Sequence, residues 1–154
     1  RIGFLVIRSQ SLHNAAMLFA QARLSPVLIG QILATAAHND DAEYINSVRE
    51  EYTKRRNLLV ELLNEIPGVK CPKPKGAFYC VAELPVEDAD DFAQWMLESF
   101  SDNGETVMVA PASGFYSQPE LGKKQVRIAY VLKSEDLKRS VELLKLALEK
   151  YNNK

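Results

Sequence analysis

The strongest constraint on the fold is residues 125–131, where the side-chain pattern repeats every two residues. The residues on one face are all apolar, namely Val126, Ile128 and Tyr130. The opposite face holds Arg127, Ala129 and Val131. A period of two predicts a β-strand. Since both faces are apolar apart from one cation, we expect this strand to lie within the protein's core sheet.

Arg127 is the one charged residue inside that strand. A cation in buried surroundings is costly unless an anion meets it. The planar guanidinium matches a carboxylate through two parallel hydrogen bonds. The pattern by itself favours an edge-strand arginine that reaches water or pairs with a nearby glutamate, and it also fits an arginine that binds an anion.

The composition narrows the class of protein. A chain of 154 residues with 47% hydrophobic and 25% charged residues can bury one sizeable core. Its formal net charge of −1 argues against a nucleic-acid-binding protein. No apolar run is long enough to span a membrane, so we expect no membrane association and a cytoplasmic location. Cys71 and Cys80 could form a disulfide, but two free thiols fit such a protein better.

The first residues of the chain are predicted to belong to the core of a larger domain. Residues 2–7 are mostly apolar and predict a buried strand, and no methionine precedes Arg1. Because native proteins rarely begin inside a core strand, we expect this chain to be cut from a longer protein.

Three helices are predicted before residue 67. The first runs from about residue 11 to 23. The second is capped by Ser25, has Pro26 at its first position and continues to His38. It is apolar nearly all round, which is typical of a buried or interfacial helix. The third covers residues 41–66 and would span roughly 35–40 Å, a length that suits a helix joining two domains.

The second half of the chain predicts a small sheet with helices. Strands are expected at residues 77–82 and 106–110, an amphipathic helix at 88–103, a long loop at 111–122 and a last helix from Ser134. The expected fold class is α+β: a small, mostly antiparallel sheet covered by helices on one face. We expect residues 1–40 to be a remnant of a larger domain with its helical junction, and residues 41–154 to form the small domain.

Four segments, in order, resemble the C-terminal portion of class I pyridoxal-phosphate-dependent aminotransferases of the aspartate aminotransferase type (fold type I). Residues 1–3 are similar to the end of the family's lysine segment, which closes in Arg-X-Gly. Residues 74–79 resemble its Pro-X-Gly-X-Phe-Tyr motif. Residues 109–115 resemble Val-X-Pro-Gly-X-X-Phe, with Ala112 in place of the usual glycine. Residues 126–129 resemble the family's arginine strand.

The resemblance implies roles for three arginines. Arg1 would grip the phosphate of the cofactor, pyridoxal 5′-phosphate, and Arg127 would hold the α-carboxylate of the amino-acid substrate. Arg23 lies near the place where some aspartate-specific members read the distal carboxylate across the dimer interface, although an interface or surface ion pair is the favoured explanation of this residue. Tyr79, Phe115 and Tyr116 are expected to be packing residues.

The same resemblance implies half of an active site. The family's Schiff-base lysine and the acid that pairs with the pyridinium nitrogen both precede the position of Arg1, so the isolated chain is predicted to be inactive. The protein that contains it would be a homodimer that transfers the amino group of aspartate to 2-oxoglutarate. The alternatives are another fold type I enzyme, such as a β-lyase or amino-acid decarboxylase, or a non-catalytic carboxylate-binding or dimerisation module.

Overall fold

The computed structural model describes residues 2–38 and 42–153, so Arg1 lies outside the described residues. The chain divides into two compact units, residues 1–47 and residues 48–154. Each unit is described here by itself. The domain boundary expected at residue 40 stays a prediction.

The first unit consists of helices α1 (Gln10–Arg23) and α2 (Leu28–His38), and neither contains a buried residue. The helix predicted from Pro26 begins two residues later than expected. The strand predicted at residues 2–7 is wrong, because this segment has no regular structure. Its apolar side chains Phe4, Leu5 and Val6 are 86%, 78% and 88% exposed. A strand needs a neighbour for its backbone hydrogen bonds, and apolar content alone does not supply one.

Helix α3 (Ala42–Asn64) is the longest element, at 23 residues or about 35 Å. It matches the helix predicted at 41–66 apart from its ends. Only its C-terminal part is buried, through Leu59, Val60 and Leu63. Gly68 follows with φ 82°, a left-handed conformation that glycine adopts without strain, and this turns the chain away from the helix.

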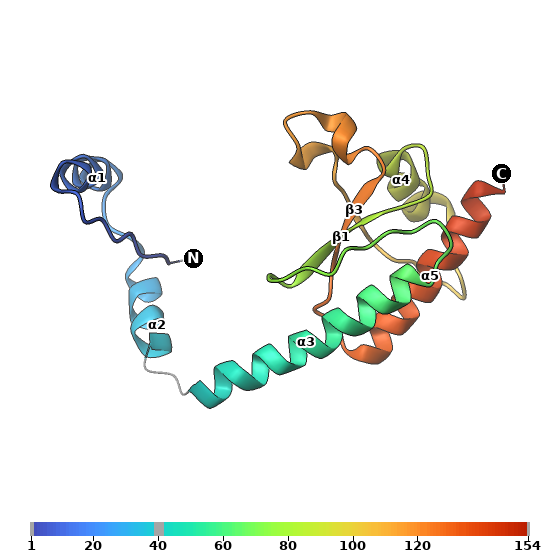
Figure 1. Cartoon of the computed structure of the whole chain (residues 1–154), viewed down its shortest axis with the longest axis horizontal. Coiled ribbons are helices and arrows are strands. Elements are labelled where there is room, and N and C mark those ends of the chain that lie inside the picture. The colour runs from blue at the N-terminus through green and yellow to red at the C-terminus, as the bar shows by residue number, and fades with distance from the viewer. Residues whose placement is uncertain (1, 39–41, 154) are drawn as a thin grey trace. The chain divides into compact units, whose positions relative to one another are not determined.

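The sheet has three strands, β1 (Tyr79–Glu83), β2 (Ala110–Pro111) and β3 (Gln125–Ala129). They lie in the order β1-β3-β2, and both pairs are antiparallel (Figure 1). Of the strand predicted at 106–110, only Ala110 pairs with β3, and Pro111 beyond it is the second paired residue. The central position of β3 excludes the edge-strand explanation of Arg127.

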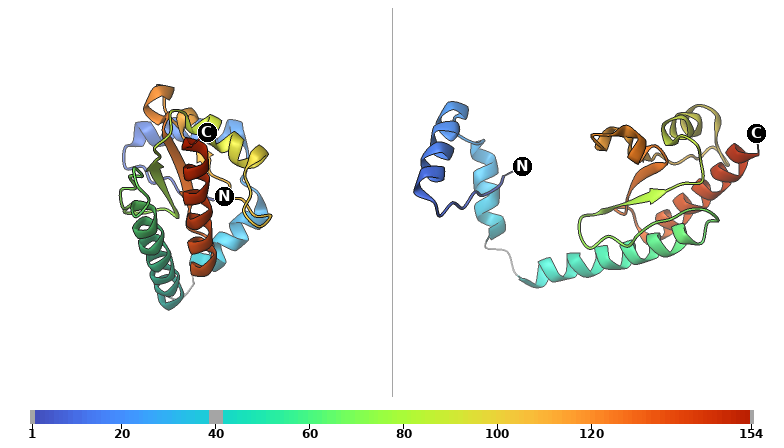
Figure 2. Two further views of the ribbon diagram at one scale, coloured as in Figure 1. Left: turned by 90° about the vertical axis from the view of Figure 1, so that its right-hand side faces the viewer. Right: turned by 45° about the horizontal axis from the view of Figure 1, so that its top comes forward.

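Helices α4 (Ala89–Ser99) and α5 (Ser134–Asn152) complete the core with the end of α3. Helices α3 and α5 lie side by side against the sheet (Figures 1 and 2). The sheet side chains that face them are buried, namely Cys80, Ala82, Val126 and Tyr130. This arrangement confirms the predicted α+β class with helices on one face. In the described part of the chain, no helix is both long and apolar enough to cross a membrane.

Helix α4 ends earlier than predicted. Asp88 caps its N-terminus by accepting hydrogen bonds from the Asp90 and Asp91 amides, at 2.9 and 3.4 Å. Phe100 is already extended, at φ −107° and ψ 131°. The pair Asn103-Gly104, expected to close the helix, instead has φ 53° and 81° and forms a turn bridged by Asp102 and Glu105. Asn-Gly with both φ positive is a hairpin-turn signal as well as a helix-end signal.

Candidate substrate-carboxylate site

Arg127 lies in the middle of the central strand. Its register partners are Val81 on β1 and Ala110 on β2. Side chains alternate along β3, so Val126 and Tyr130 point into the core while Arg127 points to the other face of the sheet. That face is open in this chain: Arg127 is exposed and Val81 is 37% exposed. The expectation that Arg127 sits in a buried strand is therefore wrong for its own face.

Two aromatic rings flank the Arg127 guanidinium. Its central carbon lies 5.2 Å from the ring centre of Tyr79 and 4.9 Å from that of Phe115. Tyr79 stands two positions from Val81 and shares its face of β1, which makes it a diagonal cross-strand neighbour of Arg127. Cation–π contacts restrict the guanidinium while its N–H donors stay available. Both rings are predicted from the sequence to be packing residues. The sequence does not indicate that the residue they pack on is Arg127.

The loop that carries Phe115 is tied down at several points. It contains two short 3₁₀ helices, η1 (Ser113–Phe115) and η2 (Pro119–Gly122). The Ser113 hydroxyl donates to the Asp90 carboxylate at 2.7 Å, and the Tyr116 hydroxyl donates to the Gln125 side-chain carbonyl at 2.7 Å. These bonds join the loop to α4 and to β3. The ring of Phe115 is therefore held beside Arg127 by fixed backbone.

Ala112 explains how the chain departs from the family motif at this loop. Its backbone has φ −102° and ψ −1°, a conformation that does not need glycine. Gly122 is the residue that needs to be small, since an added Cβ would lie 2.5 Å from the Ala112 carbonyl oxygen.

The chemistry of this arrangement is that of an anion receptor. Among residues 2–38 and 42–153, no side chain forms an ion pair or hydrogen bond with Arg127. A guanidinium oriented by two rings, with its donors unused, suits a planar carboxylate that can accept two bonds. Arg127 and its two rings are called the carboxylate site below.

The other predicted site residues are not gathered here. Arg1 lies outside the described residues. Arg23 is the last residue of α1, is exposed and belongs to the first unit, whereas Arg127 belongs to the second. Its predicted role in reading a distal carboxylate stays a prediction.

The two cysteines are free, as predicted, and the structure shows that both are buried. The neighbouring Cys80 thiol lowers the pKa of Cys71, against an opposing effect of burial. The contact with Cys71, reinforced by burial, raises the pKa of Cys80. Both side chains belong to the core below the sheet, on the face away from Arg127.

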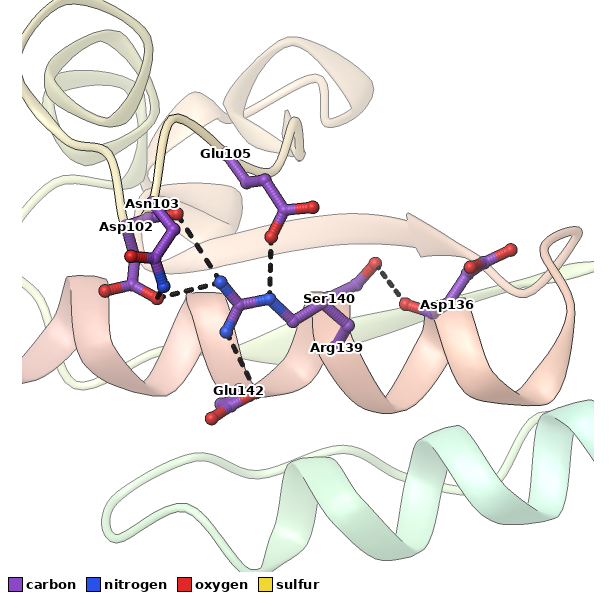
Figure 3. A network of polar contacts seen from close by, with 7 residues as sticks. All are labelled: Asp102, Asn103, Glu105, Asp136, Arg139, Ser140 and Glu142. Atoms are coloured by element: carbon purple, nitrogen blue, oxygen red, sulfur yellow. Dashed lines mark hydrogen bonds and ion pairs between the residues drawn. The ribbon is translucent and has the colours of Figure 1, made fainter.

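A second arginine, Arg139, contrasts with Arg127. Figure 3 shows its guanidinium surrounded by the carboxylates of Asp102, Glu105 and Glu142, at 2.8, 2.8 and 2.9 Å. These hydrogen bonds, that to Asp102 first, raise the pKa of Arg139 above its ordinary value. Arg139 joins α5 to the 102–105 turn. Its donors are engaged, so it offers nothing to a ligand.

Comparison with known proteins is consistent with this geometry. Residues 1–144 match the sequence profile of the family described as aminotransferase class I and II. The chain is 31% identical over 159 residues to an aspartate aminotransferase of Bacillus subtilis (strain 168). That alignment covers 99% of this chain and 38% of the Bacillus enzyme. The chain therefore spans well under half the length of this relative.

Solved structures share the fold. An aromatic aminotransferase from Pyrococcus horikoshii OT3 superposes with a TM-score of 0.64 at 30% identity, covering 77% of this chain and 31% of that one. An alanine aminotransferase from Pyrococcus furiosus gives a TM-score of 0.75 at 24% identity, with 90% of this chain and 34% of that one covered. At that identity the second likeness supports the fold alone.

Proposed function

Because the chain belongs to the class I and II aminotransferases, we propose that it forms the part of a pyridoxal-phosphate-dependent aminotransferase that holds the substrate's α-carboxylate. The observation that carries this proposal is the carboxylate site: an oriented guanidinium on the open face of the central strand, without a carboxylate partner among the described residues.

The proposed role of Arg127 is to position the amino-acid substrate. Two parallel hydrogen bonds to the α-carboxylate fix two points of the amino acid and so limit its rotation. Tyr79 and Phe115 keep the guanidinium plane from swinging away, so less side-chain freedom is lost when the substrate binds. Arg127 itself transfers no proton, since guanidinium stays protonated.

Pyridoxal phosphate, the cofactor of this family, would act as an electron sink for the bonds at the substrate's α-carbon. Arg127 offers one planar fork held between two rings, which fits one carboxylate rather than the cofactor's phosphate. Arg1 is the residue of this chain proposed to hold that phosphate, as its own fork suits a dianionic group. The reactive lysine is proposed to lie in the longer protein, outside this chain.

We further propose that the substrate pair is aspartate and 2-oxoglutarate, and that the longer protein is a cytoplasmic homodimer in which Arg23 contacts the distal carboxylate. The identity of 31% to an aspartate aminotransferase supports the acidic substrate. The identity of 30% to an aromatic aminotransferase makes an aromatic amino acid the second candidate.

A donor panel on the longer protein tests this proposal. Aspartate, alanine and phenylalanine are each offered with 2-oxoglutarate, and kcat/KM is compared. We expect aspartate to lead and Arg23→Gln to lower kcat/KM for aspartate but not for alanine. A higher kcat/KM for phenylalanine than for aspartate would overturn the proposed acidic substrate and favour an aromatic amino acid. No amino transfer from any donor, with cofactor bound, would overturn the assigned reaction.

A further inference from the structure

A second cation-lined site, a pocket, lies in the 48–154 unit. None of its lining residues belongs to the carboxylate site, and the two sites adjoin where the ring centre of Phe78 lies 5.7 Å from that of Tyr79. It has a volume of about 390 Å³ and opens between α3 and the connector that precedes β1. The connector, residues 67–78, runs back along α3, as Figure 1 and the right-hand view of Figure 2 show. Its cationic walls are Arg49, Arg56 and Lys75, and its aromatic surfaces are Tyr52, Phe78 and Tyr130. These six residues define what is called here the basic pocket.

The positive charges of the basic pocket are not neutralised by acidic side chains that line it. No aspartate or glutamate of the described part of the chain lines it. In the part of the chain that the structure describes, none of its three cations forms an ion pair. Among the described residues, Arg56 donates only to neutral acceptors, the Asn57 side-chain carbonyl at 3.1 Å and the Pro74 carbonyl at 3.4 Å. The next arginine along the helix, Arg55, by contrast pairs with Glu51 at 2.7 Å.

The wall opposite α3 is fixed rather than loose. Ala77 has φ 62°, a left-handed conformation that non-glycine residues adopt at a cost in energy. The buried Tyr130 hydroxyl donates to the Ala77 carbonyl at 2.9 Å, and the bond from Arg56 to the Pro74 carbonyl ties the connector to α3. Because hydrogen bonds already hold this wall in place, little conformational freedom of the backbone is lost when a ligand binds.

We propose that the basic pocket binds a small phosphate ester with a planar apolar body. Two guanidinium groups and one ammonium suit a group of charge near −2 with several acceptor oxygens. The rings of Tyr52 and Phe78 offer apolar surface to the rest of the ligand. This site does not depend on the proposed aminotransferase function, because none of its residues is assigned to the substrate or the cofactor.

The experiment is a titration of the longer protein with its cofactor bound, so that the cofactor's own phosphate site is filled. The probe is phenyl phosphate, measured by calorimetry, with inorganic phosphate and phenol as partial ligands. We expect saturable binding of phenyl phosphate, weaker binding of inorganic phosphate and none of phenol. No saturable binding of phenyl phosphate would overturn the proposal. Tighter binding of the carboxylate anion phenylacetate than of phenyl phosphate would overturn the phosphate class.

Matched variants locate the binding. Arg56→Gln removes a half-buried guanidinium and should weaken phenyl phosphate binding about tenfold. The more exposed Arg49→Gln and Lys75→Gln should each weaken it by roughly threefold. Neither exposed side chain makes a hydrogen bond within the described residues, so both variants should fold normally. Lys54→Gln on the same helix and Lys73→Gln in the same connector lie outside the pocket lining and should change nothing. Equal losses in these controls would assign the binding to general surface charge and overturn the site.

Discussion

Replacing Arg127 by lysine separates charge from geometry at the carboxylate site. Lysine keeps the positive charge and loses the planar fork, so one of the two parallel hydrogen bonds to the substrate carboxylate is lost. A hydrogen bond to a charged group is worth about 1.5–3 kcal/mol. This corresponds to a fall in kcat/KM of roughly ten- to a hundredfold or somewhat more. Arg127→Ala loses both bonds and should cost at least about a hundredfold.

The same substitutions should affect folding much less than activity. Arg127 is exposed, and its described contacts are those with the rings of Tyr79 and Phe115. Each such contact at an exposed site contributes about 0.5–1 kcal/mol. The free energy of unfolding should therefore fall by no more than about 1–2 kcal/mol, and cofactor affinity should hardly change.

The assay measures kcat and KM for the amino acid in the longer protein, together with a cofactor titration and a denaturant unfolding curve. Lys124→Ala, an exposed cation beside the start of β3, is the matched control and should behave as the unmodified protein. Arg1→Ala should show the opposite pattern, with cofactor retention lost first and turnover only as a consequence. Unchanged kcat/KM in Arg127→Ala would refute the carboxylate site and leave Arg127 as a surface cation.

Three further outcomes are expected. Burial raises the pKa of the Tyr130 phenol above its ordinary value. The folded state therefore holds this proton more tightly than the unfolded state, and the free energy of unfolding should fall as pH rises above about 10. Tyr130→Phe should reduce that slope and cost about 1 kcal/mol near neutral pH through the lost bond to Ala77; an unchanged slope would count against burial as its cause. Cys71 and Cys80 are 4% and 2% exposed, so a thiol reagent should label neither in the folded chain and both in denaturant; rapid labelling of the native chain would contradict their burial. Gly68→Ala combines φ 82° with a Cβ 2.9 Å from Pro85 and should cost more than about 1 kcal/mol in urea unfolding, while an unaffected midpoint would show that the turn relaxes.

Local patterns predicted the longer helices and two of the strands, at residues 77–82 and 125–131, apart from their ends, but they predicted residues 2–7 and 106–110 poorly. Helix α5 was expected from Ser134 and begins there, and α3 differs from its predicted range only at the ends. Helical hydrogen bonds close within one segment, so sequence periodicity reports on them directly. A strand's hydrogen bonds are made with another segment. Residues 2–7 have the composition of a strand without a partner, and of residues 106–110 only Ala110 pairs with β3.

The amino-acid pattern places Arg127 in a strand, on the face opposite Val126 and Tyr130, because side chains must alternate in an extended chain. The family resemblance adds a role for Arg127. Three facts come from the folded structure: β3 is the central strand, the face of Arg127 is open, and Tyr79 and Phe115 flank the guanidinium. The folded structure also brings Arg56 and Lys75 to one pocket. These facts depend on strand register and on contacts between residues far apart in the chain, which no local pattern encodes.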